Sequence, residues 1–278
     1  MSCKLMMGVM LHLREGDPQA AVDKVKALGL PSCQLGWPPN TPLEVGQALQ
    51  AAAQAAGVTV TTLWASLPGP AVWNFTEGPS TIGLVPDQWR PERVKALQAA
   101  AVVAGKIGIQ SITTHCGFIP SWPGDRQYQE TVAALKDVLA ACTDSGVQFW
   151  YETGQETPIT LLRTIQDVGY ENQGINLDPA NLLMYGNGNP VDALDVLGKY
   201  VHSVHAKDGF FPTDPNKLGE EVPIGKGKVD FKKVFTRLLE LGYTGDITIE
   251  REISGPKQIE DIKQSIHYLE GVIQEVLG

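Results

Sequence analysis

The chain has 278 residues, with 22 Lys and Arg against 31 Asp and Glu, so its formal net charge is −9 at pH 7. Nucleic-acid-binding proteins draw much of their affinity from Lys and Arg that displace counterions, and an anionic membrane surface attracts the same residues. This charge balance therefore argues against a nucleic-acid partner and against a membrane surface. Hydrophobic residues make up 43% of the chain and charged residues 19%, which is ample apolar material for a large core.

The sequence favours a cytoplasmic protein. No stretch approaches the roughly 18 uninterrupted apolar residues that a membrane span needs. The apolar run near the N-terminus is followed at once by charged residues and lacks a small-residue cleavage site, so it reads as a first strand and not as a signal peptide. The four cysteines are widely spread without a CxxC pair, which indicates neither a zinc knuckle nor a disulfide framework and suits a reducing compartment.

Short apolar or β-branched runs alternate along the chain with longer Ala-, Leu- and Val-rich segments at helical spacing. In chain order, the pattern predicts strands at residues 4–12, 32–37, 58–66, 111–117, 148–154, 174–179, 201–208 and 246–252. The predicted helices between and after them include 17–28, 43–56, 91–107, 127–145, 231–241 and 258–276. No shift of composition marks a domain boundary, so we treat residues 1–278 as one domain.

This alternation predicts an α/β protein built as a single (β/α)8 TIM barrel. Several strand runs are apolar throughout, which is typical of parallel strands buried on both faces. Eight units of about 35 residues can close into a barrel, whereas the alternative, a doubly wound open sheet, usually has five or six strands. Two long connections, 68–89 and 210–229, interrupt this alternation of strands and helices, and we expect both to shape the mouth of the barrel.

An ionisable residue stands at the end of each of the last four predicted strands: Glu152, Asp178, His205 and Glu250. Because the carboxyl ends of barrel strands meet at one face, three carboxylates and one imidazole should converge there. Like charges at close range need a counter-charge, and one divalent cation supplies it. This donor set suits Mn²⁺ first, then Mg²⁺ or Co²⁺, and also admits Zn²⁺. The alternative is that each acid only caps a helix or joins a salt bridge.

Nearly the whole chain, and most strongly the segment from Tyr151 to Glu252, resembles the sugar phosphate isomerase/epimerase family, the xylose isomerase-like TIM barrels. The resemblance rests on YETGQETPITLL, INLDPANLLMYG, VHAKDG and VPIGKGKVDFKKVFTRLLELGYTGDITIERE. It implies one divalent metal ion held by Glu152, Asp178, His205 and Glu250. In the ketose 3-epimerase branch of that family, the two metal-bound glutamates serve as acid and base, which makes Glu152 and Glu250 the expected catalytic pair.

Two positions depart from the ketose 3-epimerase pattern. Asn181 stands where many relatives carry a histidine three residues after the metal aspartate, and Phe211 stands where an arginine is expected. We keep Asn181 as a candidate substrate contact. The related endonuclease IV needs more histidines than the five present here, and the charge of −9 opposes a DNA substrate.

Five other side chains are candidate substrate contacts, each with a structural alternative. His115 follows the fourth strand, and its alternative is a core histidine bonded to a backbone carbonyl. Lys207 should point the same way as His205 and bind a substrate oxygen or neutralise Asp178, unless it forms a salt bridge to Glu152 or Asp208. The alternative for Glu156 is a helix N-terminal charge. Aromatic rings suit sugar C–H faces, which makes Trp64 and Trp37 candidates, with core packing as their alternative.

These observations predict a metal-dependent isomerase or epimerase that moves a proton next to the carbonyl of a sugar or keto-sugar, through an enediolate that the metal stabilises. The expected partner is a small carbohydrate substrate, and the chain is also a candidate homo-oligomer. Two alternatives stay open. One is a metal-dependent dehydratase or lyase acting on an inosose or a keto-glycoside, and the other is a carbohydrate-binding barrel without catalysis.

Overall fold

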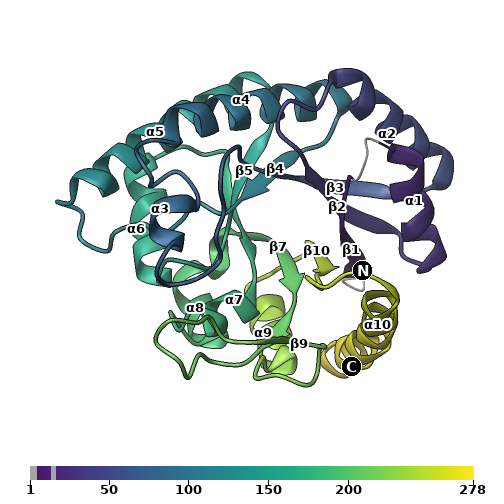
Figure 1. The fold of residues 1–278 in the computed structure, drawn as a ribbon. Coiled ribbons are helices and arrows are strands. Elements are labelled where there is room, and N and C mark those ends of the chain that lie inside the picture. Colours follow the sequence, from purple (N-terminus) through teal and green to yellow (C-terminus); the bar gives the residue numbers. More distant parts are fainter. Residues whose placement is uncertain (1–4, 14–16) are drawn as a thin grey trace.

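The computed structural model describes residues 5–13 and 17–278, and within them eight parallel strands close into a barrel (Figure 1). Around the barrel the strands follow the order β1-β10-β7-β6-β5-β4-β3-β2. They are β1 (Met6–His12), β2 (Ser32–Trp37), β3 (Thr59–Ala65), β4 (Ser111–Thr114), β5 (Gln148–Glu152), β6 (Gln173–Leu177), β7 (Val201–Ala206) and β10 (Asp246–Ile249). Closure is made by β1 and β10, which pair in register from Met6 with Asp246 to Val9 with Ile249. The predicted TIM barrel is confirmed.

Helices lie outside the strands and cover them (Figure 1). They are α1 (Pro18–Ala27), α2 (Leu43–Ala56), α3 (Gly78–Thr81), α4 (Arg90–Ile107), α5 (Arg126–Asp144), α6 (Pro158–Val168), α7 (Pro179–Met184), α8 (Pro190–Leu197), the 3-10 helix η1 (Gly198–Tyr200), α9 (Phe231–Glu240) and α10 (Pro256–Leu277). The six helices predicted from the sequence are all present. The sequence analysis named none of α3, α6, α7 and α8.

Strand burial explains why the apolar runs became barrel strands. Every residue of β2, β4, β6 and β10 is buried. The apolar core lies in the barrel and between the barrel and the helix layer, where side chains such as Leu35, Phe149 and Phe235 have no exposed surface. Such strands need helices on their outer face, which fits the strand–helix alternation. Lys4, where the first strand was predicted to begin, lies outside the described residues.

Local signals set the ends of helices near the candidate site. Thr157 caps α6 by accepting a hydrogen bond from the backbone N–H of Thr160, Pro158 occupies the first turn, and Gly169 ends the helix with a left-handed φ of 72°. Asp178 caps α7 in the same way, through the N–H of Asn181 at 2.9 Å. These caps place the chain directly after β5 and β6 at the carboxyl face of the barrel.

The two long connections lie at this face. Residues 68–89 contain α3, and Ala71, Trp73 and Thr81 line the large cavity described below. Residues 210–229 contain the short strand β9 (Glu221–Val222), which pairs with β8 (Asp208–Gly209) just beyond β7. Within residues 5–13 and 17–278, no helix has the length and apolar character of a membrane span.

Candidate metal centre and its cavity

The four predicted ligands converge at the carboxyl ends of β5, β6, β7 and β10, which are neighbours in the barrel. Glu152 ends β5, Asp178 follows β6, His205 lies in β7 and Glu250 follows β10. All four are buried, and one ligand atom from each lies within 4.8 Å of the others. The chain thus builds one compact cluster from residues nearly a hundred positions apart.

Direct contacts hold the cluster together. His205 Nδ1 lies 3.0 Å from Glu152 Oε1 and 3.3 Å from Glu250 Oε2. Asp178 uses Oδ1 to cap α7, while its Oδ2 is buried without a hydrogen-bond partner. The helix-cap alternative therefore holds for Asp178, but only for one of its two oxygens. The other oxygen is free to bind a ligand in the cluster.

Burial and neighbouring charges perturb the pKa values in opposite directions. Burial raises the pKa of Asp178 to about 8, against the attraction of Lys207. Burial also acts to raise the pKa values of Glu152 and Glu250. It is outweighed by His115 and His205 at Glu152 and by Lys207 and His205 at Glu250, so both pKa values end below the ordinary one. Burial lowers the pKa of His205, but Glu152 and Glu250 outweigh it and raise that pKa well above its usual value.

Lys207 is a buried cation beside the cluster. Its Nζ lies 2.8 Å from Glu252 Oε1, 3.3 Å from Glu250 Oε2 and 3.7 Å from Asp178 Oδ2. It also donates to Asn181 Oδ1 at 3.3 Å. Lys207 therefore neutralises acids of the cluster, as one interpretation predicted. The salt bridge expected to Glu152 or Asp208 is not among its contacts, because the Asp208 carboxylate accepts backbone N–H groups instead.

These residues fit a divalent cation. Lys207 supplies one positive charge, which it shares among Asp178, Glu250 and Glu252. A divalent ion would add positive charge to the cluster, and it would give Asp178 Oδ2, which accepts no hydrogen bond, a ligand contact. Carboxylate oxygens with one imidazole nitrogen are a donor set that Mn²⁺, Mg²⁺, Co²⁺ and Zn²⁺ accept.

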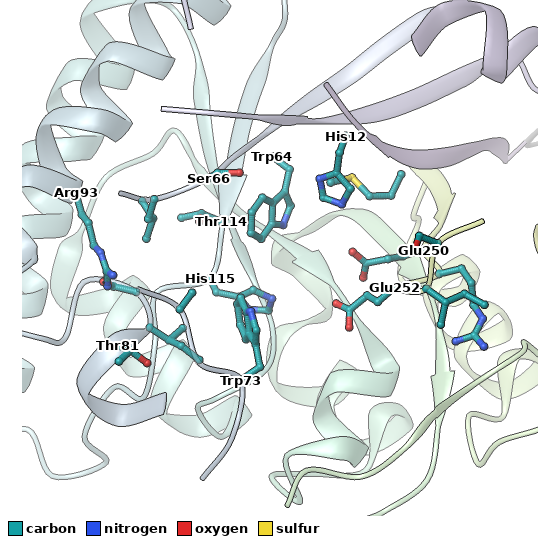
Figure 2. Close-up of a pocket in the computed structure, with 18 of the residues that line it drawn as sticks. His12, Trp64, Ser66, Trp73, Thr81, Arg93, Thr114, His115, Glu250 and Glu252 are labelled. Carbon is teal, nitrogen blue, oxygen red and sulfur yellow. The ribbon is translucent and has the colours of Figure 1, made fainter. Parts of the chain in front are cut away.

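A cavity of about 620 Å³ opens beside the cluster, with Glu250 in its wall (Figure 2). Figure 2 shows the carboxylates of Glu250 and Glu252 directed toward the aromatic side chains Trp64, His115 and Trp73. The His115 ring lies edge-on to both tryptophans, with centroid distances of 6.1 Å to Trp64 and 5.1 Å to Trp73. Aromatic faces beside polar groups are typical of carbohydrate sites and other small-molecule pockets.

Two cavity residues also touch Glu152. Trp64 donates from Nε1 to Glu152 Oε2, and His115 Nε2 lies 3.5 Å from Glu152 Oε1. His115 Nδ1 is buried without a hydrogen-bond partner, so the carbonyl-bonded core histidine that we considered is not what the structure shows. The cavity therefore contacts the candidate ligand cluster directly through Glu250, and indirectly through Trp64 and His115, the partners of Glu152.

Comparison with known proteins places this architecture in a family. A family model described as a xylose isomerase-like TIM barrel matches residues 22–272. The chain belongs to that family. The family-level resemblance seen in the sequence is thereby confirmed.

Similar proteins span a range of identities. A xylose isomerase domain protein from Planctomyces limnophilus is 32% identical, with a TM-score of 0.91 over 98% of each chain. An L-ribulose 3-epimerase has the same fold at 16% identity, with a TM-score of 0.74 over 98% of this chain and 96% of that one. The uncharacterized protein MJ1311 of Methanocaldococcus jannaschii is 26% identical over 194 residues, 66% of this chain. The chain spans only 63% of the length of MJ1311.

The xylose isomerase-like barrel brings some predicted contacts to the cavity and leaves others away from it. Trp64 and His115 line it, and Lys207 and Asn181 lie directly behind Glu250 and Asp178. Trp37 is not brought there. It is 3% exposed in the apolar core, beside Ala96 and Ala100 of α4, so the packing alternative describes it.

Glu156 is buried at the start of the connection to α6 but does not line the cavity. Burial raises its pKa to about 8, and one of its carboxyl oxygens has no hydrogen-bond partner. A helix N-terminal charge is therefore a poor description of this residue, since at neutral pH the carboxyl is mostly protonated.

Three residues of the site were not predicted from the sequence: Gln34, Trp73 and Glu252. Gln34 touches His205, Trp73 packs on His115, and Glu252 binds Lys207. Gln34 offered a signal, because it is an amide within the otherwise apolar strand SCQLGW. Trp73 lies in an irregular connection, where neither strand nor helix periodicity indicates which way a side chain points.

Proposed function

We propose that this barrel is a divalent-metal-dependent isomerase or epimerase of a sugar or keto-sugar. The observation that carries the proposal is the convergence of Glu152, Asp178, His205 and Glu250 within 4.8 Å, with Glu250 in the wall of the cavity. An enolisation needs a base beside a carbon acid and a positive charge near the carbonyl oxygen. The carboxylates of the cluster supply the base, and a divalent ion held by the cluster would supply the positive charge.

A divalent ion held by the four ligands would supply Lewis-acid stabilisation of the negative charge that develops on the substrate oxygen. One of Glu152 and Glu250 removes the proton beside the carbonyl, and the other returns a proton on the opposite face. Trp64 and His205 hold Glu152 in place, while Lys207 and His205 hold Glu250. The pKa values of both carboxylates lie below the ordinary one, which suits the residue that acts as the base, whereas the residue that returns the proton must first take one up.

The cavity favours an uncharged carbohydrate. Two cations line it in the described part of the chain, and both are engaged elsewhere. Arg93 donates to the backbone carbonyls of Pro68, Gly83 and Pro70. Arg251 pairs with Glu221 and Asp261 at 2.9 Å each. With Glu250 and Glu252 in the wall, a phosphate group would meet negative charge.

A metal-dependent dehydratase or lyase acting on an inosose or keto-glycoside is the second candidate. Two observations favour it. Phe211, at the position of the arginine expected in ketose 3-epimerases, is 55% exposed and does not line the cavity. A volume of about 620 Å³ also leaves room for more than one sugar ring. The two reactions begin with the same proton removal, and only the lyase yields a product lighter than the substrate.

We propose Mn²⁺ as the bound metal and the cytoplasm as the compartment. Cys33, Cys116 and Cys142 are buried and unpaired, which supports a reducing environment, while Cys3 lies outside the described residues. A single domain over residues 1–278 and a homo-oligomeric state remain predictions.

The first prediction concerns turnover. Glu152→Gln and Glu250→Gln should each slow solvent deuterium incorporation into a keto-sugar by at least about 10²-fold, because a positioned acid–base group contributes about 10² to 10⁴ in rate. Circular dichroism should show that both variants stay folded, and Glu44→Gln on the exposed side of α2 serves as the matched control. Normal exchange in either variant would contradict its role, and a lighter product would establish the lyase instead.

A further inference from the structure

We propose that Gln34 is a positioning residue that orients the imidazole of His205 so that its Nδ1 faces the metal. The inference rests on the metal site of the proposed function and adds a residue from the opposite part of the barrel to it. Gln34 lies in β2 and His205 in β7, which are not neighbouring strands. Their contact therefore crosses the interior of the barrel, beneath the carboxylate cluster.

The contact is short and fully buried. Gln34 Oε1 lies 3.0 Å from His205 Nε2, on the side of the ring away from Glu152 and Glu250. Both side chains are completely inaccessible to solvent. Without Gln34, the Nε2 group would lose its protein partner in a place that bulk water does not reach.

Two further contacts fix which end of the Gln34 amide meets the ring. Gln34 Nε2 donates to Ser203 Oγ at 2.7 Å and to Asn176 Oδ1 at 3.3 Å, and both of these residues have no exposed surface. With the amide nitrogen engaged there, the oxygen is the atom that faces His205 and accepts from it. Ser203 lies two residues before His205 on β7. This strand therefore carries both the hydroxyl and the imidazole that the Gln34 amide contacts.

The consequence for metal binding follows from the chemistry of imidazole. A neutral imidazole carries its single N–H on one ring nitrogen and a free lone pair on the other. When Nε2 donates to Gln34, the lone pair lies on Nδ1. That is the nitrogen 3.0 Å from Glu152 and 3.3 Å from Glu250. Outer partners of this kind commonly fix the tautomer and the orientation of a metal-binding histidine.

The test is metal affinity, measured by titration of metal-free protein with Mn²⁺. Gln34→Met keeps the length of the side chain but removes the acceptor, and we expect it to weaken binding by about 10- to 100-fold. Gln34→Glu keeps an acceptor at the same place. It should bind Mn²⁺ at least as tightly as the wild type does, since it also adds negative charge. The visible spectrum of Co²⁺-loaded protein should change in Gln34→Met, because it reports the ligand geometry.

A matched control separates positioning from general damage to the barrel interior. Thr62 Oγ1 bonds Ser111 Oγ at 2.8 Å, and both residues are fully buried and do not contact the four ligands. Thr62 is the register partner of Gln34 on β3, so Thr62→Val removes a neighbouring interior hydrogen bond that does not involve His205. If Thr62→Val and Gln34→Met weaken Mn²⁺ binding equally, the proposal for Gln34 is overturned.

The remaining outcomes are equally decisive. Wild-type protein that takes up neither Mn²⁺ nor Co²⁺ would refute the proposed metal site itself. If the wild type binds and Gln34→Met binds as tightly, only the role of Gln34 is refuted. Should Gln34→Met fail to fold, Ser203→Ala replaces it, because it removes the 2.7 Å contact that holds the Gln34 amide. Ser203→Ala should then bind more weakly than Thr62→Val, and equal affinities overturn the proposal.

Discussion

The carboxyl group of Glu156 shows how one buried residue can make stability depend on pH. It is 4% exposed, and burial raises its pKa to about 8 from an ordinary value of 4.5. Between these two values the folded protein keeps the proton while the unfolded chain has lost it. The folded state then binds more protons than the unfolded state, so the free energy of unfolding falls as the pH rises through this window.

Glu156→Gln should remove this contribution. We expect the melting temperature of the metal-free wild type to fall more steeply between pH 5 and about 8 than that of the variant. The raised pKa of Asp178 makes the melting temperature of both proteins fall with rising pH. It therefore does not contribute to the difference between them. Exposed Glu44→Gln is the control and should follow the wild type. Parallel curves for wild type and Glu156→Gln would show that this carboxyl is ionised in the folded protein.

For single residues, the sequence predicted the four members of the cluster better than the side chains that support them. Glu152, Asp178, His205 and Glu250 could be found because a charge at the end of an apolar strand has few ordinary explanations. Gln34 could not be assigned, because its partner His205 lies on a distant strand and only the closed barrel brings them together.

Among the elements, the connection after β7 is held in its conformation by one carboxylate, that of Asp208. Asp208 Oδ1 accepts the backbone N–H groups of Gly209 and Val229 at 2.9 and 3.0 Å. Its Oδ2 accepts those of Gly225 and Gly227 at 2.9 and 2.8 Å. The glycine-rich segment GKGK is thus folded around an aspartate nearly twenty residues earlier. This arrangement fixes β9, whose Glu221 pairs with Arg251 beside the cavity.

Gly227→Ala should loosen this connection. A Cβ atom at residue 227 would stand 2.1 Å from Asp208 Oδ1, so the backbone must move away from the carboxylate. We expect faster proteolysis within residues 210–229 and a lower melting temperature. Gly271→Ala in α10 is the matched control, because its Cβ meets nothing within 4 Å and alanine favours a helix by up to about 1 kcal/mol. Proteolysis of Gly227→Ala at the wild-type rate would contradict the anchoring role.

The long connections also mark a limit of prediction for the elements. Their length and their Pro and Gly content indicated that both lie at the mouth of the barrel. The internal structure of residues 210–229 depends on Asp208, and hydrogen bonds from one side chain to distant backbone groups leave no periodic signal in the sequence. The short helices α3 and α7 escaped prediction for a related reason, since each is too short to show a helical period.

For the whole molecule, the candidate metal cluster joins residues that are far apart in the sequence but lie on neighbouring strands. Its ligands come from four strands that are adjacent in space, β5, β6, β7 and β10. In the metal-free fold, burial raises the pKa of Asp178 to about 8, while Glu152 and Glu250 stay ionised close to each other, and holding these like charges in a region of low dielectric costs stability. A bound divalent ion should relieve this repulsion, and linkage then makes the stability of the fold depend on its concentration.

Mn²⁺ should raise the melting temperature of the wild type. At a free Mn²⁺ concentration of about 100 times the Kd, linkage adds about 2.7 kcal/mol, which corresponds to roughly 5–10 °C for a protein of this size. Asp178→Asn, which weakens the cluster, should show little of this shift in differential scanning calorimetry. Equal shifts in both proteins would place the stabilising ion elsewhere on the surface.

The pairing of β1 with β10 has a consequence for the kinetics of folding. Glu250 directly follows β10, and β10 joins the first strand to the seventh. The full ligand set is complete once β10 has paired with β7, and the pairing of β10 with β1 then closes the barrel by joining the two ends of the sheet, a contact of long sequence separation. An ion that acts after the transition state slows unfolding and leaves the refolding rate unchanged. Stopped-flow unfolding and refolding with and without Mn²⁺ would separate the two rates, and faster refolding would mean that the cluster forms before the transition state.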